Sequence, residues 1–334
     1  MQWVCQGVVA DVPPQQAFGV GLYSQVFVAK RHGGASRVTG RPGVHRDPAW
    51  SPSGNLIAMA TGRAVEIRSP SGRIAEVIEG GGESVAWAPD ERRIALLVTP
   101  RHGPNYNLVV ADLRSESRDV VAHDVSGRPS WSADGRTLFY LRTRSLGTRY
   151  GRTGLFAVPA RGGTPRRLAA NAESCTEALP SPTGRWVLFG RGSDLWVVRP
   201  DGSGERRLIR SIDCPEPPTY DPPPSYGWTL NGRAVYGGRS EDGRPTVRTL
   251  AGGRAEPGVR FSGEQYAMSL DGRRVAWLGR YGRTLRSART DGRDRLELAR
   301  FESSWGDPDV DVRTLAWSPD GRRLAIEALR DDDP

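Results

Sequence analysis

The sequence predicts an all-β fold, a single β-propeller ring of seven blades, each a four-stranded antiparallel sheet. Three observations lead to this fold: one hairpin motif recurs seven times, its turn returns at intervals of 37 to 49 residues, and no segment shows a sustained helical period. Intervals of about 40 to 50 residues with about four strands per unit are typical of propeller blades. Six blades are the alternative, since two weak repeats could merge.

The clearest copy of the hairpin covers residues 317–326. Pro319 sets the φ of the turn, Asp320 can bond back to the backbone, and Gly321 accepts a positive φ. The apolar residues that follow alternate with polar ones, as in a half-buried strand. The seven copies, from the aromatic position to the turn, are Trp50–Gly54, Trp87–Glu91, Trp131–Gly135, Pro180–Gly184, Trp228–Gly232, Met268–Gly272 and Trp317–Gly321.

Two further strands are expected between successive hairpins, as in residues 194–198 and 205–208. The last hairpin lacks this second pair, whereas residues 25–29 and 36–39 supply one at the other end of the chain. We therefore expect N- and C-terminal strands to close the last blade together, which removes an open sheet edge. This organisation predicts one propeller domain over residues 24–334, preceded by a lead-in segment over residues 1–23.

The chain carries a net charge of +9, and its sequence pI is near 10. Clustered basic residues can neutralise phosphate, which suggests nucleic acid as a partner. The arginines argue against this because they are distributed at one or two per repeat, directly after the hairpin turns. We therefore expect them to be solvated strand starts, with no nucleic-acid partner. They are Arg92, Arg93, Arg136, Arg185, Arg233, Arg273, Arg274, Arg322 and Arg323.

Targeting and redox signals are sparse. Residues 1–5 contain no basic segment followed by an apolar core, so the sequence predicts no signal peptide and a cytoplasmic protein. A misassigned start or a removed leader would make the protein secreted or periplasmic. No apolar run reaches the roughly 18 residues of a membrane span. Cys175 and Cys214 either pair with each other or are two separate thiols.

The pattern at residues 317–325, together with the strand, turn and strand at residues 194–208, resembles the TolB-like, WD40-like propeller repeat. The resemblance covers nearly the whole chain and implies a soluble bacterial propeller. It implies no particular role, because propellers host unrelated functions. Glu91, Pro180 and Met268 depart from the repeat pattern. The same repeat occurs in prolyl-oligopeptidase-like peptidases, but the chain has no Gly-x-Ser-x-Gly elbow, so no such activity is expected.

Four connections are longer than their counterparts and are expected on one face of the ring. Loops on a rigid scaffold often carry binding residues, and aromatic residues with arginines suit a protein, peptide or glycan ligand. The sequence therefore predicts a non-catalytic scaffold that binds a protein or peptide there, without a cofactor. Tyr220 has a second interpretation, packing within its proline-rich loop. The predicted contact residues are His102, Tyr106, Arg149, Tyr150, Tyr220 and Trp305.

A different hypothesis places chemistry at the mouth of the ring channel. His45 and Asp47 precede the first inner strand, and with His102 they could form an acid/base or divalent-metal centre. The protein would then be a lyase or hydrolase acting on a glycan or a lactone-like substrate. The alternating carboxylates of Asp307, Asp309 and Asp311 are either a weak Ca²⁺ site or a solvated acidic loop.

Overall fold

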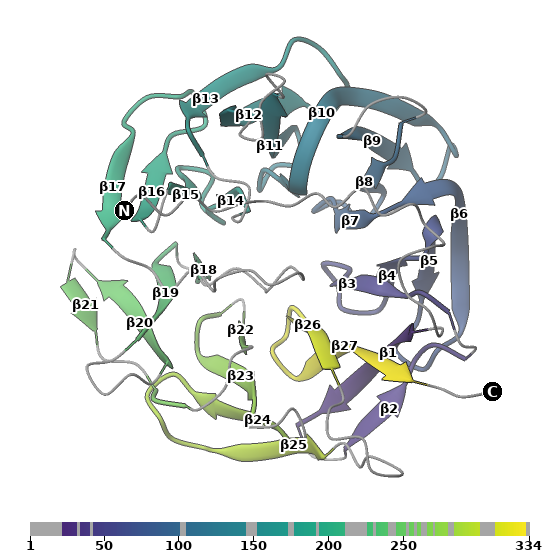
Figure 1. Ribbon diagram of the computed structural model, residues 1–334, viewed down its shortest axis with the longest axis vertical. Coiled ribbons are helices and arrows are strands. Elements are labelled where there is room, and N and C mark those ends of the chain that lie inside the picture. The colour runs from purple at the N-terminus through teal and green to yellow at the C-terminus, as the bar shows by residue number, and fades with distance from the viewer. Residues whose placement is uncertain are drawn as a thin grey trace.

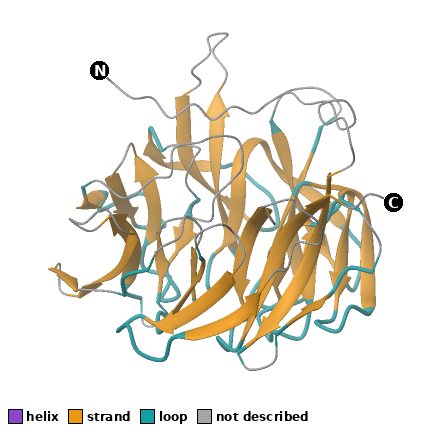
Figure 2. Cartoon of the chain, turned by 60° about the horizontal axis from the view of Figure 1, so that its bottom comes forward, coloured by secondary structure: helices purple, strands orange, loops and turns teal. Residues whose placement is uncertain are grey.

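The computed structural model describes residues 22–31, 34–40, 43–100, 105–144, 152–172, 177–191, 194–210, 226–229, 232–239, 245–251, 254–256, 259–261, 266–269, 271–279, 284–300 and 311–331. Its sheets stand in a ring (Figure 1), and strands, turns and loops make up the whole described part (Figure 2). The all-β prediction is therefore confirmed. In this part of the chain, no helix is long and apolar enough to cross a membrane.

Four of the sheets use strands that are consecutive in the chain, each strand pairing with the next one. The first contains β3 (Arg46–Trp50), β4 (Ile57–Ala60), β5 (Gly62–Arg68) and β6 (Ile74–Gly82). The second contains β14 (Leu179–Pro180), β15 (Val187–Arg191), β16 (Asp194–Val198) and β17 (Arg206–Ile209). The third contains β18 (Tyr226–Trp228), β19 (Ala234–Arg239), β20 (Pro245–Ala251) and β21 (Arg254–Glu256). The fourth contains β22 (Tyr266–Met268), β23 (Arg274–Leu278), β24 (Thr284–Arg289) and β25 (Leu296–Arg300).

The two ends of the chain meet in one four-stranded sheet, in the order β2-β1-β27-β26. Its strands are β1 (Leu22–Lys30), β2 (Ala35–Arg37), β26 (Asp311–Trp317) and β27 (Arg323–Asp331). The strands β1 and β27 pair antiparallel along their whole length, from Leu22 with Asp331 to Lys30 with Arg323. The predicted closure by N- and C-terminal strands is confirmed, and β1 begins two residues before the predicted domain start.

The remaining sheet has seven strands and contains two copies of the hairpin motif. Its long strand β10 pairs with β9 from Arg118 to Val125 and with β11 from Val125 to Trp131, so it changes partner near its middle. Gly127 has a φ of +72° just after this change, where the register to β11 also shifts. Its strands are β7 (Ser84–Trp87), β8 (Arg93–Val98), β9 (Tyr106–Asp112), β10 (Arg118–Trp131), β11 (Thr137–Arg144), β12 (Arg152–Pro159) and β13 (Arg166–Ala170).

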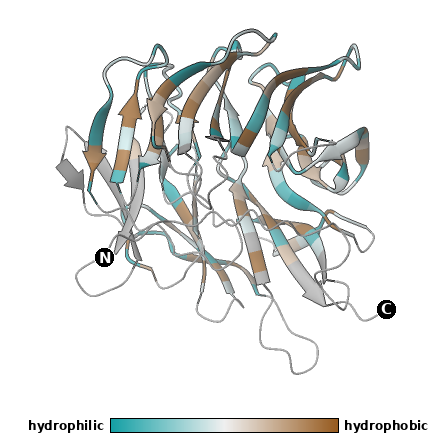
Figure 3. Ribbon diagram, turned by 45° about the horizontal axis from the view of Figure 1, so that its top comes forward, coloured by the Kyte–Doolittle hydropathy of each residue, from teal (hydrophilic) through white to brown (hydrophobic). Residues whose placement is uncertain are grey.

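The core lies between neighbouring sheets rather than at the ring centre. One cluster joins Val65 and Ile67 of β5 to Ile94 and Leu96 of β8, all at most 1% exposed. Strands such as β4 and β23 are buried along their whole length, and each sheet offers apolar residues to its neighbours (Figure 3). Each repeat thus buries its apolar surface only by stacking on the next, which is why the chain needs the complete ring.

The recurring tryptophan joins each repeat to the one before it. Five indole Nε1–H groups donate to the backbone carbonyl that immediately precedes the aromatic position of the preceding copy, at 2.7 to 3.1 Å. The two copies with Pro180 and Met268 have no indole to donate at this position. The bonds run from Trp50 to Ala316, Trp87 to Ala49, Trp131 to Ala86, Trp228 to Leu179 and Trp317 to Ala267.

The acidic residues of the turns are turn formers, as the sequence predicts. Asp134 accepts a hydrogen bond from the Ser132 hydroxyl at 2.6 Å and another from the Arg136 backbone N–H at 3.0 Å. These two bonds hold the pKa of Asp134 below its usual value. Asp271 and Asp320 accept the same pair of bonds in their own turns.

The prediction that every arginine after a turn is solvated is wrong for the second arginine of three pairs, namely Arg93, Arg274 and Arg323. Arg93 lies over the indole of Trp131 in the next repeat, 5.0 Å from the ring centroid, and donates to the Gly135 carbonyl at 2.8 Å. Arg323 lies likewise over Trp50, at 4.8 Å. The others are exposed, namely Arg92, Arg136, Arg185, Arg233, Arg273 and Arg322. Arg93 and Arg323 therefore stack on the next repeat through their planar guanidinium groups, whereas Arg274 pairs with Asp294 of its own sheet.

Candidate functional site

The ring has two different faces. The turn face carries the tight turns at residues 51–54, 88–91, 132–135, 181–184 and 318–321. The loop face is the opposite end, where the inner strands β3, β7 and β26 begin. These inner strands, with the second half of β10 and with β14, β18 and β22, stand nearest the centre of the ring (Figure 1).

One layer of polar side chains crosses the inner strands near the loop face. Each member is the third residue before the aromatic position of its copy. Asp47, Ser84, Arg128, Glu177 and Thr314 form this mouth layer. The same position in the two other copies is Ser225 and Gln265, which lie outside the described residues.

Asp47 is the centre of the mouth layer. Its Oδ2 accepts a hydrogen bond from the Ser84 hydroxyl at 2.6 Å, and its Oδ1 forms an ion pair with Arg128. Its backbone N–H donates to Oε2 of Glu327 on β27 at 2.9 Å. A φ of +58° and a register shift between β3 and β4 turn the residue out of regular strand geometry. The bulge thereby lets one residue contact three other repeats.

Arg128 extends the layer from Asp47 to Glu177. Its Nε lies 3.3 Å from Oε1 of Glu177, just before β14. The side chains of Arg128 and Glu177 are 30% and 23% exposed, against 9% for Asp47. The Asp47 carboxylate is therefore shielded from solvent, whereas the positive charge of Arg128 and the negative charge of Glu177 are both partly exposed.

Glu327 lies behind Asp47 and is only 5% exposed. Burial raises the pKa of Glu327, and the nearby negative charge of Asp47 raises it further. Hydrogen bonds from the Asp47 N–H and from Thr314, together with the Arg128 charge, oppose the rise in pKa without cancelling it. The fold therefore favours the protonated form of Glu327 more than water does.

The sign of this shift predicts a pH dependence of stability. A raised pKa means that the folded state binds the proton more tightly, so this group lowers the unfolding free energy as pH rises from 4.5 through the folded pKa. Glu327→Gln removes the titration while keeping an acceptor oxygen. We expect its unfolding free energy, relative to the wild type, to be higher at about pH 8 than at about pH 4 in urea titrations. A difference that is constant with pH would contradict the raised pKa.

His45 is buried beside this layer and contacts a different carboxylate. Its backbone N–H donates to the Ser24 hydroxyl at 2.8 Å, and its Nε2 lies 3.5 Å from Oε2 of Glu66 on β5. Arg68 pairs with the same Glu66 oxygen at 2.7 Å. Among the described contacts, none joins the His45 side chain to the Asp47 carboxylate. The two residues predicted together thus occupy adjacent but separate networks.

The other predicted residues fall largely outside the described part of the chain. Tyr106 begins β9 and packs half-buried against the core cluster that contains Val125. Asp311 begins β26. Within the described ranges, no group of three or more His, Cys, Asp or Glu side chains could hold a metal ion. Outside those ranges lie His102, Arg149, Tyr150, Tyr220, Trp305, Asp307, Asp309, Cys175 and Cys214.

The mouth layer itself was not predicted from the sequence, although a signal for it exists. The third residue before the aromatic position is polar in all seven copies, even though it lies on an inner strand. Reading each copy in register would have found Ser84, Arg128 and Glu177. No such sequence signal marks the contact of Glu327 with this layer, because Glu327 lies on the second strand of its hairpin.

Comparison with known proteins shows the fold. No family model matches the chain. It is similar to an oligogalacturonate lyase from Vibrio parahaemolyticus, at 13% identity and a TM-score of 0.66 over 92% of this chain and 97% of that one. It is also similar to a putative TolB from Agrobacterium tumefaciens, at 18% identity and a TM-score of 0.50 over 93% of this chain and 99% of that one. A third similar structure is the β-propeller domain of Cps50 (Swd1) from Myceliophteria thermophila, at 12% identity and a TM-score of 0.59 over 86% of this chain and 98% of that one. The chain is therefore a TolB-like, WD40-like β-propeller by fold.

Proposed function

We propose that this protein is a seven-bladed propeller scaffold that binds a protein or peptide partner on its loop face. The blade count follows from dividing the seven-stranded sheet at Val125, where β10 changes partner. The first half of β10 then ends one blade and the second half begins the next. With the five four-stranded sheets, this division accounts for all seven hairpins.

The observation that carries the binding proposal is the mouth layer. Both Asp47 oxygens contact another repeat, Oδ2 through the Ser84 hydroxyl and Oδ1 through Arg128, so the carboxylate joins blades to one another. The Arg128–Glu177 pair remains partly exposed in the middle of the loop face. A rigid centre with an accessible arginine suits an interface hot spot, around which longer loops supply further contacts.

The predicted loop anchors test this proposal. Tyr150→Ala combined with Trp305→Ala should weaken partner binding by about 2 kcal/mol or more, because aromatic anchors dominate interface energetics. The partner is first identified by affinity capture and cross-linking, and binding of the purified partner is then measured by calorimetry. The thermal midpoint should stay unchanged, and Arg322→Ala on the turn face is the matched surface control. Undiminished affinity in the double variant would contradict the loop-face site.

A propeller enzyme is the second candidate, and the buried Glu327 favours it. A carboxyl group with a raised pKa beside Asp47 is a feature that active sites share with structural networks. In this reading, His45, Asp47 and His102, with or without a divalent metal, act on a glycan or a lactone-like substrate. Stoichiometric metal in the purified protein that is lost in His45→Ala would favour this metal-dependent enzyme over the scaffold.

A further inference from the structure

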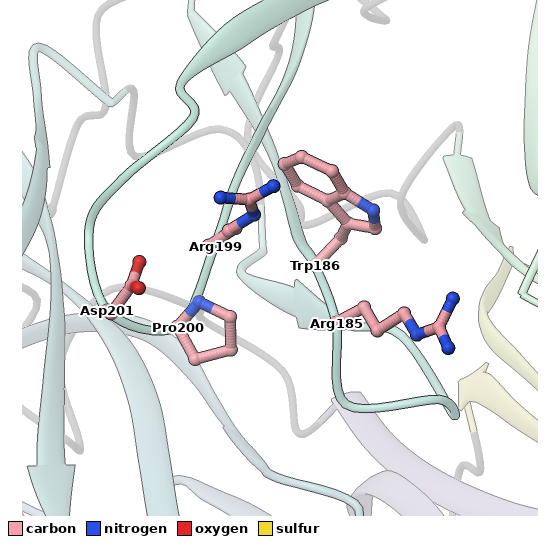
Figure 4. A pocket seen from close by; sticks show the side chains of 5 residues that line it. All are labelled: Arg185, Trp186, Arg199, Pro200 and Asp201. Atoms are coloured by element: carbon pink, nitrogen blue, oxygen red, sulfur yellow. The ribbon is translucent and has the colours of Figure 1, made fainter.

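A pocket of about 490 Å³ lies on the turn face, away from the mouth layer. Its lining comes from the β15 start and from the turn between β16 and β17, which are adjacent because Val187 pairs with Val198. Figure 4 shows the guanidinium of Arg199 extending beside the indole of Trp186, whereas the Arg185 side chain extends away from the ring. The lining residues are Arg185, Trp186, Arg199, Pro200 and Asp201.

The pocket is strongly cationic around one aromatic ring. The guanidinium carbons of Arg199 and Arg206 lie 5.4 and 5.2 Å from the Trp186 ring centroid. Among the described residues, no carboxylate forms an ion pair with Arg185, Arg199 or Arg206. Asp201 accepts instead from the Ser203 N–H and hydroxyl at 2.8 and 2.7 Å. Two arginine charges thus lie over the indole and a third, that of Arg185, lines the pocket. In the described part of the chain, none of the three is in salt-bridge contact with a carboxylate.

In the corresponding turn of the β22–β25 sheet, carboxylates neutralise the arginine charges. Both turns close with the same pair of backbone bonds, from Arg199 and Gly202 in one and from Arg289 and Gly292 in the other. There, Arg289 pairs with Asp291 at 3.0 Å.

Trp186 lies two residues after the turn glycine of its hairpin. In the β22–β25 sheet, Arg274 occupies the same position and pairs with Asp294 at 2.6 Å. In the β22–β25 sheet, therefore, carboxylates neutralise both arginines.

One carboxylate of the β22–β25 turn has no counterpart in the pocket turn. Gly204 occupies the position of Asp294, and both have a left-handed backbone, with φ of +66° and +53°. A Cβ at Gly204 would lie 3.5 Å from the Trp186 ring, which is ordinary contact. An aspartate here would meet no steric clash and would take a left-handed φ, as Asp294 does, but the chain has a glycine and leaves the space beside the indole open.

We infer that this pocket binds an acidic peptide segment of a protein partner, at a site separate from the loop face. Its arginines would pair with Asp or Glu side chains, and the Trp186 face would pack against the apolar stem of one of them. Its volume lies within the range of ordinary ligand pockets. The site opens on the opposite face of the ring, so the scaffold can hold two partners at once.

The test uses a fluorescein-labelled octaglutamate peptide and fluorescence anisotropy at about 50 mM salt, where exposed charges are weakly screened. The full-length protein should bind the peptide. Arg199→Ala and Gly204→Asp should each weaken binding about fivefold, which corresponds to about 1 kcal/mol. Gly204→Asn has the same size as Gly204→Asp without the charge and should bind like the wild type. Arg322→Ala, which follows the turn glycine of another blade as Arg185 does in this one, should also leave binding unchanged.

Four results would overturn the proposal: no binding, equal effects of Gly204→Asp and Gly204→Asn, equal effects of Arg199→Ala and Arg322→Ala, or full displacement of the peptide by low-millimolar inorganic phosphate. The last result would show a simple anion site. The Tyr150→Ala, Trp305→Ala double variant should bind octaglutamate normally. Failure on one face is therefore distinguishable from failure on the other.

Discussion

Asp47→Asn is expected to lower the unfolding free energy by about 2 to 4 kcal/mol. The substitution keeps a side chain that tolerates the left-handed φ of +58°, so backbone strain does not contribute. It removes the charge that Arg128 pairs with and replaces one of two acceptor oxygens with an amide donor. Because Asp47 is 7% exposed, water cannot replace the lost partner. Urea denaturation followed by circular dichroism measures the change.

Asp124→Asn is the matched control for this substitution. Asp124 has the same φ of +58° and also pairs with an arginine, Arg142, at 2.9 Å. Its side chain is 53% exposed, so the same chemical change should cost no more than about 1 kcal/mol. Equal costs at the two positions would show that the mouth layer does not hold the blades together. A double-mutant cycle of Asp47→Asn with Arg128→Met would then measure the coupling directly.

Trp131→Phe is expected to lower the unfolding free energy by about 2 kcal/mol. Phenylalanine keeps the aromatic packing but loses the Nε1–H that bonds the Ala86 carbonyl of the preceding repeat at 3.0 Å. That carbonyl is then left without this partner in a part-buried place. The stacking of Arg93 over the smaller ring also weakens. Thermal and urea denaturation both report the loss.

Trp196→Phe separates the hydrogen bond from the size of the ring. Trp196 also stacks against an arginine, Arg191, at 4.4 Å, but its Nε1 is buried and makes no hydrogen bond. Removing a buried N–H that has no hydrogen-bond partner removes the free-energy cost of having taken that group out of water. We therefore expect this variant to be less destabilised than Trp131→Phe by about 1 kcal/mol. Equal losses would mean that the recurring indole contributes only its volume.

Turn chemistry made the fold predictable. The Ser-Pro-Asp-Gly pattern specifies a local conformation through bonds within five residues, such as Ser318 with Asp320 at 2.5 Å. Such short-range signals survive in a single sequence because they depend on no other part of the chain. The recurring tryptophan was visible for the same reason, although its partner in the preceding repeat was not. The exposure of Arg93 was mispredicted because its partner, Trp131, belongs to the next repeat.

The candidate site was predictable only in part. The sequence places His45 and Asp47 at the start of the first inner strand, and the structure has them there, both 7% exposed. It could not show that Asp47 contacts Glu327, since 280 residues separate the two. It also could not show that the His45 ring lies beside the Glu66 carboxylate instead. Such contacts depend on which strands become neighbours and on the bulge that turns Asp47.

The sequence by itself determined the all-β class, the seven hairpins, the acidic turns and the sharing of one sheet by both ends of the chain. These follow from local backbone preferences and from the need to pair open strand edges. Only the tertiary structure decided the mouth layer, the raised pKa of Glu327 and the cationic pocket at Trp186. The first two depend on side chains that ring closure brings together from distant segments, and the pocket depends on the pairing of β15 with β16. Local sequence signals carry no information about such distances.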